Sequence, residues 1–140
     1  MNNYLENIFS LKNKTALITG ASRGIGAEIA LAYVKAGANV VCVSRSESTE
    51  QKQIETFYRQ CDIADSQQFQ SICESIDVDY GGIDILVNNA AINPFFGPVE
   101  DLDPSIFDKI MEVNVKAPWS LSNLVLPHLK INKKGSIINI

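Results

Sequence analysis

The sequence has few of the residues and patterns that mark metal centres, disulfide frameworks, nucleic-acid interfaces or membrane anchors. It contains one histidine, His128, and three cysteines without paired or metal-type spacing, which argues against a metal site and favours buried, reduced thiols. A net charge of −4 gives no electrostatic footprint for nucleic acid or for an anionic membrane. No apolar run approaches the roughly 20 residues of a membrane span, and the polar N-terminus lacks the apolar core of a signal peptide. We therefore expect a cytoplasmic protein.

The composition is that of a folded domain. The chain is 46% hydrophobic and 20% charged, which is typical of a globular protein. Its length of 140 residues is enough for one domain with a core and too short for two. Segments with the pattern of strands alternate with segments with the pattern of helices. This alternation predicts an α/β fold with a doubly wound parallel sheet in the strand order 3-2-1-4-5. The expected strands are residues 15–19, 39–43, 55–60, 83–87 and 136–140.

The first two crossovers of this sheet differ in length. A helix over residues 24–36 is expected to stop at Gly37. Its predicted apolar face consists of Ile25, Ile29, Ala32 and Ala36, which recur at helical spacing. Between Arg45 and the third strand only about ten residues remain, so a crossover helix there is expected to be shortened to a turn or two.

Two longer helical segments follow. Asp65 or Ser66 is expected to cap a helix whose apolar face is Phe69, Ile72, Cys73 and Ile76. Asp103-Pro104 is a cap and first-turn signal for the other helix, which we expect to be interrupted or bent at Pro118 before it continues to Leu129.

Three glycines stand where the first strand meets the first helix. In the segment 19–26 they follow the spacing Gly, three residues, Gly, one residue, Gly. Glycine permits positive φ and close approach of the backbone, so a tight turn can direct several N–H groups at one anion. The helix that begins there adds its N-terminal amides and the positive end of its dipole. The segment therefore predicts a binding site for the phosphates of a dinucleotide.

The residues after the second strand bear on which dinucleotide is bound. A carboxylate there would accept hydrogen bonds from the adenosine ribose and favour NAD, but the chain has Ser44-Arg45 about 20 residues past the turn. Arg23 can approach the same place from the other side, and a guanidinium binds a phosphate through two parallel hydrogen bonds. Both arginines could equally be solvated surface charges, and Glu47 and Glu50 lie nearby. The pattern favours NADP(H) over NAD(H).

These segments resemble the short-chain dehydrogenase/reductase family. The turn has that family's TGxxxGxG form, Asn88–Ala91 matches its NNAG element with Ala91 in place of the final glycine, and Asn114 lies in a segment, NVKAP, that matches its fourth large helix. The resemblance covers about residues 11–140. It implies a single, incomplete NAD(P)-binding Rossmann domain over residues 1–140, truncated after the fifth strand.

The resemblance also implies roles for residues outside the turn. In the family, an Asp in the position of Asp62 hydrogen-bonds the adenine amino group and the next residue, Ile63, supports the ring, although Asp62 could equally be a helix cap or turn residue. Asn88 and Asn89 would stabilise the sheet and line the adenosine pocket. Asn114 would distort its helix and hold a water that connects the catalytic lysine to solvent.

The predicted site thus has one residue of catalytic type, Asn114, and no metal ligands. The expected cofactor-binding residues are Gly20, Ser22, Arg23, Gly24, Ile25, Gly26, Arg45, Asp62, Ile63, Asn88, Asn89 and Ala90. The catalytic serine of the family follows the fifth strand, and its YxxxK pair lies further on. None of the four tyrosines has a lysine four residues later, so these residues have no counterpart here.

Two functions remain open. The resemblance implies an NADP(H)-dependent oxidoreductase that reduces small carbonyls or oxidises alcohols, present as an N-terminal fragment that is inactive alone. The loop 91–97, with its NPFFG segment, would border the substrate mouth and resembles members that reduce ketones and retinal-type carbonyls. The alternative is a non-catalytic dinucleotide-binding or interaction module, and a third interpretation, which assigns no function, is a decayed gene product with no stable fold. In either case an exposed apolar edge strand and helices that lack partners over residues 106–129 favour a homo-oligomer.

Overall fold

The computed structural model describes residues 3–46 and 56–140. In this part of the chain five parallel strands form one sheet in the order β3-β2-β1-β4-β5, which confirms the predicted topology. The strands are β1 (Thr15–Thr19), β2 (Asn39–Ser44), β3 (Phe57–Gln60), β4 (Ile85–Asn88) and β5 (Ser136–Asn139). β1 is central and buried throughout, which explains why its sequence, TALIT, is a nearly continuous apolar run.

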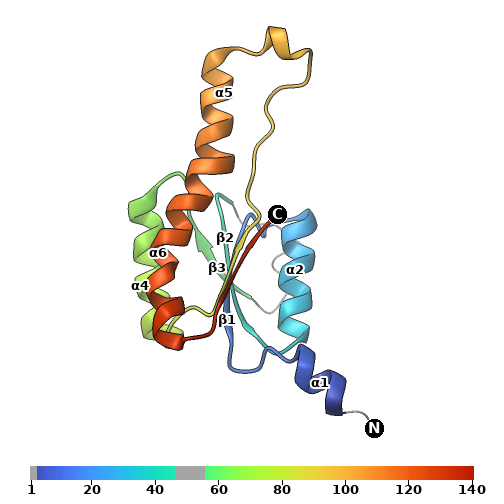
Figure 1. The fold of residues 1–140 in the computed structure, drawn as a ribbon, viewed down its shortest axis with the longest axis vertical. Helices are drawn as coiled ribbons and strands as arrows, with labels where there is room; N and C mark the ends of the chain where they lie inside the picture. The colour runs from blue at the N-terminus through green and yellow to red at the C-terminus, as the bar shows by residue number, and fades with distance from the viewer. Residues whose placement is uncertain (1–2, 47–55) are drawn as a thin grey trace.

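Helices cover both faces of the sheet (Figure 1). One face carries α2 (Gly24–Lys35), and the other carries α4 (Ser66–Tyr80) and α6 (Ala117–Asn132). Successive side chains of a strand point to opposite faces, so β1 contributes to two separate cores. Ala16 and Ile18 pack on the α2 side, whereas Leu17 packs with residues of α4 and α6.

The buried face of α2 differs from the predicted one. Ile25 is 65% exposed and Ala32 is also exposed, whereas Gly26, Ala27 and Ala30 are buried. The start of α2 packs closely against Asn89 and the glycine turn, so a residue with a side chain does not fit at Gly26. The predicted apolar face was therefore wrong for Ile25 and Ala32, whereas Ile29 packs against the core as expected and the helix itself is present.

The α4 prediction is confirmed. Asp65 is the N-cap, and its carboxylate accepts hydrogen bonds from the amides of Gln67 and Gln68. The four predicted apolar residues are the buried residues of this helix. Gly81, at a φ of 76°, forms the left-handed C-cap because glycine adopts this conformation without steric cost.

The helix that was expected to bend at Pro118 is distorted before that residue. α5 (Pro104–Met111) begins after the cap Asp103 and continues through a π-helical turn over residues 112–116 into α6. Pro118 lies in the first turn of α6, where a missing N–H costs little. A short helix, α1 (Asn3–Phe9), was not predicted. The expected crossover helix lies, with Glu47 and Glu50, outside the described residues.

α5 and the loop after β4 extend beyond the sheet (Figure 1). This loop includes a short 3₁₀ helix, Val99–Asp101, and α5 has no buried residue. Phe107 and Met111 on α5 are 49% and 41% exposed. β5 is an edge strand whose residues are mostly exposed. The described chain thus presents apolar surface at the places that the sequence indicated. None of its described helices has the length and apolar character needed to cross a membrane.

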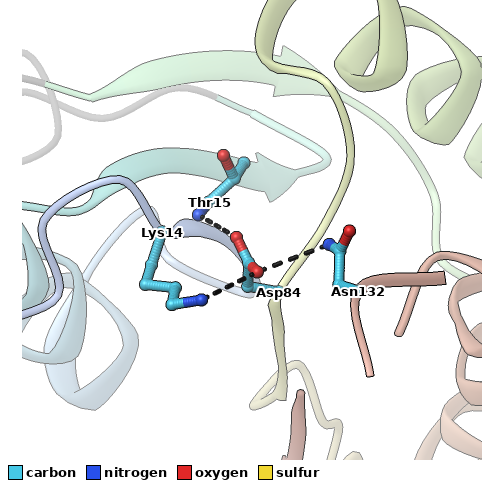
Figure 2. Close-up of polar contacts among 4 residues, drawn as sticks. All are labelled: Lys14, Thr15, Asp84 and Asn132. Carbon is cyan, nitrogen blue, oxygen red and sulfur yellow. Dashed lines mark hydrogen bonds and ion pairs between the residues drawn. The ribbon is translucent and has the colours of Figure 1, made fainter. Parts of the chain in front are cut away.

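Asp84, directly before β4, connects the amino-terminal ends of three strands, β1, β4 and β5; Figure 2 shows its side-chain contacts. Its carboxylate accepts hydrogen bonds from the Thr15 amide at 2.9 Å, the Lys14 ammonium at 3.3 Å and the Asn132 side-chain amide at 3.4 Å. Its own amide donates to the Thr15 carbonyl, and its carbonyl accepts from the Ser136 amide. One residue therefore connects the starts of β1 and β5 to the end of α6.

We expect Asp84→Ala to lower the free energy of unfolding by about 1–3 kcal/mol, because the Thr15 amide would be buried without an acceptor. Chemical denaturation measures this change. Asp79→Ala is a matched control, since it removes an exposed carboxylate paired with Arg59; we expect a change of about 0–1 kcal/mol there. Equal effects of the two substitutions would contradict the role given to Asp84.

All three cysteines are buried, and Cys61 and Cys73 are free thiols. Burial raises the pKa of Cys61 to about 11 and that of Cys73 to about 12, and nearby carboxylates add to both shifts. Because the unfolded chain ionises these thiols at lower pH, their contribution to stability is present below about pH 9 and is lost as the pH rises toward 12.

We expect a thiol-specific reagent to label Cys61 and Cys73 slowly in the native chain at pH 7, because both are buried, and rapidly in denaturant. Rapid native labelling would contradict this assignment.

Candidate dinucleotide-binding site

The glycine turn lies between β1 and α2 and has the backbone conformation that its sequence predicted. Gly20 and Gly24 have φ values of 65° and 58°, in the left-handed region that favours glycine. The amide of Gly20 donates to the Val43 carbonyl at 2.8 Å, which joins the turn to β2. The N-cap residue of α2, Arg23, makes no side-chain cap hydrogen bond. The side chain of the N-cap residue therefore does not occupy the start of α2, which lies beside the glycine turn.

The three glycines have different surroundings. A Cβ on Gly24 would meet no atom within 4 Å, so the backbone borders open space at that point. A Cβ on Gly26 would lie 2.4 Å from the Asn89 side-chain nitrogen and 2.4 Å from the Gly20 carbonyl oxygen, and one on Gly20 would lie 2.7 Å from the Ala90 Cα. Gly20 and Gly26 allow close packing, whereas Gly24 leaves room for a ligand beside the start of the helix. This arrangement fits a pyrophosphate group.

Asn89 and Ala90, at the end of β4, support the turn from the sheet side. The side-chain amide of Asn89 donates to the carbonyls of Thr19 and Gly20 at 3.1 and 3.0 Å. The Thr19 hydroxyl accepts from the amides of Asn89 and Ala90, both at 3.1 Å, and donates to the Val87 carbonyl at 3.3 Å. Two segments that are about 70 residues apart in sequence thus form one rigid unit.

Thr19 is the functional residue that the sequence analysis did not select. Its hydroxyl makes three hydrogen bonds at the base of the turn and is 1% exposed. The signal for it was present, because a threonine at the end of a fully buried strand needs partners for its hydroxyl. Its position directly before the first glycine made the turn the natural place for those partners.

Of the predicted adenosine-side residues, Arg45 follows β2, Asp62 and Ile63 follow β3, and Arg23 lies in the glycine turn. Arg23 and Arg45 are both exposed. The carboxylate of Asp62 accepts from the Ala64 amide at 3.0 Å, so the turn role that the sequence left open for Asp62 is present. Ile63 is 8% exposed and belongs to the core on the α4 side. These positions, with the glycine turn, lie at the carboxyl edge of the sheet, where ligands bind in open α/β folds.

Asn114 lies in the middle of the π-helical turn and holds the loop after β4. Its side-chain oxygen accepts from the Ile92 amide and its side-chain nitrogen donates to the Ile92 carbonyl, both at 2.8 Å. The helix is thus distorted at this residue. Both polar atoms of the side chain are engaged with the backbone, which fixes the loop that begins the 91–97 segment.

Asn88 is buried beside this region at the end of β4. Its side-chain nitrogen donates to the Asn139 side-chain oxygen at 2.9 Å and to the Ser122 hydroxyl at 3.3 Å. Its side-chain oxygen has no hydrogen-bond partner among the described residues. A cavity bordered by Asn88, Asn114 and Asn139 lies here between β4, β5 and the start of α6. Asn88 therefore supports the sheet and also borders this cavity.

Comparison with protein families decides the relationship. A family model described as short chain dehydrogenase matches residues 14–140. The chain belongs to this family. Members of the short-chain dehydrogenase family bind NAD(P).

Individual relatives agree. The chain is 40% identical over 140 residues to the short chain dehydrogenase/reductase dpfgG of Gibberella zeae, covering 94% of this chain and 52% of that protein. It is 34% identical over 136 residues to dehydrogenase/reductase SDR family member 4 of Homo sapiens, covering 91% of this chain and 49% of that protein. A metagenomic short-chain oxidoreductase solved in complex with NADP matches with a TM-score of 0.81 at 34% identity, over 92% of this chain and 62% of that one. The chain spans about half the length of the two curated relatives.

Proposed function

We propose that this short-chain dehydrogenase chain binds NADP(H) at the carboxyl edge of its sheet and serves an oxidoreductase that interconverts small carbonyls and alcohols. The observation that carries the proposal is the glycine turn, with open space beside Gly24 and with its base held by Asn89. The pyrophosphate would receive hydrogen bonds from the amides at the start of α2, aided by the helix dipole. When bound, the nicotinamide supplies or accepts the hydride of the reaction.

The preference for NADP(H) over NAD(H) rests on charge at the end of β2. The position where a carboxylate would accept from the ribose hydroxyls carries Ser44-Arg45 instead. Arg45 and Arg23 are exposed on segments that adjoin the turn. Two guanidinium groups can neutralise a 2′-phosphate and donate paired hydrogen bonds to it. The NADP complex of a 34% identical structure is consistent with this preference.

The other cofactor contacts follow from the same edge. Asp62 would receive a hydrogen bond from the adenine amino group, and Ile63 and Ile25 would border the cofactor together with Ser22. Asn114 would serve the reaction by fixing the loop after β4, through its two hydrogen bonds to Ile92. None of the four tyrosines of the 140 residues lies near Asn114 in the sequence or precedes a lysine by four residues. We propose that these 140 residues bind the cofactor but do not turn over a carbonyl substrate alone.

Amide resonances of the isotopically labelled chain test this assignment when NADPH is added. We expect the largest shifts in residues 20–26, at Arg45 and at Asp62, because these amides lie along the proposed binding edge. Shifts confined to α6 or to the Asp84 cluster would contradict it. With a ketone present, we expect no consumption of NADPH by the 140-residue chain; steady consumption would show that it has the catalytic groups we consider absent.

Two properties of the wider protein are part of the proposal. Exposed apolar residues on α5 and at the start of α6, including Phe107, Met111 and Trp119, favour association with further polypeptide, which we take to be a second copy. The buried thiols Cys61 and Cys73 suit a reducing compartment, which we take to be the cytoplasm. A non-catalytic dinucleotide-binding module is the second candidate, favoured only by the absence of a tyrosine–lysine pair in these 140 residues.

A further inference from the structure

The last residue of β2, Ser44, and the two residues after it, Arg45 and Ser46, each accept hydrogen bonds at their backbone carbonyl groups. The Ser44 carbonyl accepts from the Tyr58 hydroxyl at 3.1 Å and from the Cys61 amide at 3.0 Å. The Arg45 carbonyl accepts from the Gln60 side-chain amide at 3.0 Å, and the Ser46 carbonyl accepts from the Ser44 hydroxyl at 2.8 Å.

Gln60 occupies a particular place among these donors. The ladder between β2 and β3 ends with the pair Ser44 and Gln60, so Arg45 lies one residue beyond the last paired position. The side chain of Gln60 supplies the hydrogen bond that the ladder no longer provides. Because the donor comes from a side chain, it can be removed without changing the strand backbone.

These bonds constrain the direction in which the Arg45 side chain leaves the chain. A hydrogen bond to a carbonyl fixes the orientation of its peptide plane, and the peptide planes on both sides of Arg45 are held by Tyr58, Cys61 and Gln60. An exposed arginine on an unconstrained segment would lose conformational entropy when it binds a ligand. A segment that is already constrained loses less conformational entropy on binding, so the affinity of Arg45 for a ligand is higher.

We infer that Gln60, with Tyr58, is a positioning residue for cofactor specificity: it holds the Arg45 backbone so that the guanidinium faces the 2′-phosphate of NADP(H). This inference rests on the proposed function, since it takes Arg45 to be the 2′-phosphate ligand. Gln60 does not touch the cofactor in this account. Its effect is confined to the cofactor that carries the phosphate.

Calorimetric titration of the 140-residue chain with NADPH and NADH tests the inference. Gln60→Met keeps the length of the side chain and removes the donor. One neutral hydrogen bond corresponds to about a three- to tenfold change in affinity, so we expect NADPH to bind about three- to tenfold more weakly and NADH to bind as in the wild type. Tyr58→Phe, which removes only the hydroxyl, should shift the same ratio in the same direction. Gln70→Ala is the control, because Gln70 also has a side-chain hydrogen bond on the surface, to Glu74 on α4, and should leave both affinities unchanged.

The outcomes separate the inference from the proposal on which it rests. If the wild type shows no preference for NADPH, or Arg45→Ser leaves that preference intact, the assignment of the 2′-phosphate to Arg45 fails. If Arg45→Ser removes the preference while Gln60→Met and Tyr58→Phe retain the wild-type ratio, the positioning role alone is overturned. Equal weakening of both cofactors by Gln60→Met would likewise overturn it, since a general loss of structure does not distinguish them.

Discussion

Gly26→Ala is expected to abolish tight binding of NADPH and to destabilise the fold. The added Cβ would lie 2.4 Å from both the Asn89 side-chain nitrogen and the Gly20 carbonyl oxygen, and 2.9 Å from the Ala21 Cα. Two of these atoms belong to the backbone of the turn, so the turn itself must move. Overpacking of this kind costs about 1–3 kcal/mol of stability. Displacement of even one amide from the phosphates would weaken binding by about 10- to 150-fold, because hydrogen bonds to charged groups contribute about 1.5–3 kcal/mol.

Gly81→Ala separates the two effects of that substitution. Gly81 has a φ of 76°, and a Cβ there would meet no atom within 4 Å. An alanine at this C-cap would pay about 1 kcal/mol or more for the left-handed conformation, but it lies at the end of α4, away from the glycine turn. We expect Gly81→Ala to lower the unfolding free energy and to leave the affinity for NADPH unchanged. If the folded Gly26→Ala variant bound NADPH with the same affinity as Gly81→Ala, the turn would not depend on the close packing of Gly26 against Asn89, and our assignment would be wrong.

Arg45→Asp is expected to reverse the cofactor preference. It replaces a cation by an anion at the end of β2, where a carboxylate can accept from the ribose hydroxyls of NAD(H). Loss of the charge-assisted hydrogen bonds should weaken NADPH by about 10- to 150-fold, and repulsion from the 2′-phosphate acts in the same direction. NADH should bind equally well or more tightly. Fluorescence of the reduced nicotinamide on titration measures both affinities.

Lys35→Asp is the charge-matched control for Arg45→Asp. Lys35 is exposed in the last turn of α2, at the opposite end of that helix from the glycine turn. The substitution changes the net charge by the same amount, so any effect of overall charge on a polyanionic ligand appears in both variants. We expect the control to retain the wild-type ratio of NADPH to NADH affinity. A similar loss of NADPH binding in both variants would show that Arg45 has no specific role.

Much of the fold could be predicted because local signals and packing agree. The α4 prediction succeeded because Asp65 caps the helix and the four apolar residues at helical spacing all reach the core. The α2 face failed because a glycine at a close contact carries no hydrophobic signal, although Gly26 defines the packing there. The bend expected at Pro118 was misplaced, whereas the distortion that the resemblance implied at Asn114 is present, held by a tertiary contact between Asn114 and Ile92 rather than by proline.

The sequence indicated which segments form the site, but it did not indicate the hydrogen bonds that connect them. The glycine spacing indicated the turn, and the chain order of the strands indicated that the other segments would meet at one edge. The hydrogen bonds of Thr19 and the donors from Gln60 and Tyr58 join residues on different strands. Such pairings depend on strand register, which the sequence pattern does not specify by itself.

Calorimetric titration of the wild-type chain with NADPH and with NADH tests the central claim most directly. We propose that the carboxyl edge of this sheet binds a dinucleotide and recognises its 2′-phosphate through Arg23 and Arg45. We expect saturable binding of one NADPH per chain, at least about tenfold tighter than NADH, since a charge-assisted hydrogen bond contributes about 1.5 kcal/mol or more. Equal affinities, or tighter binding of NADH, would contradict recognition of the 2′-phosphate.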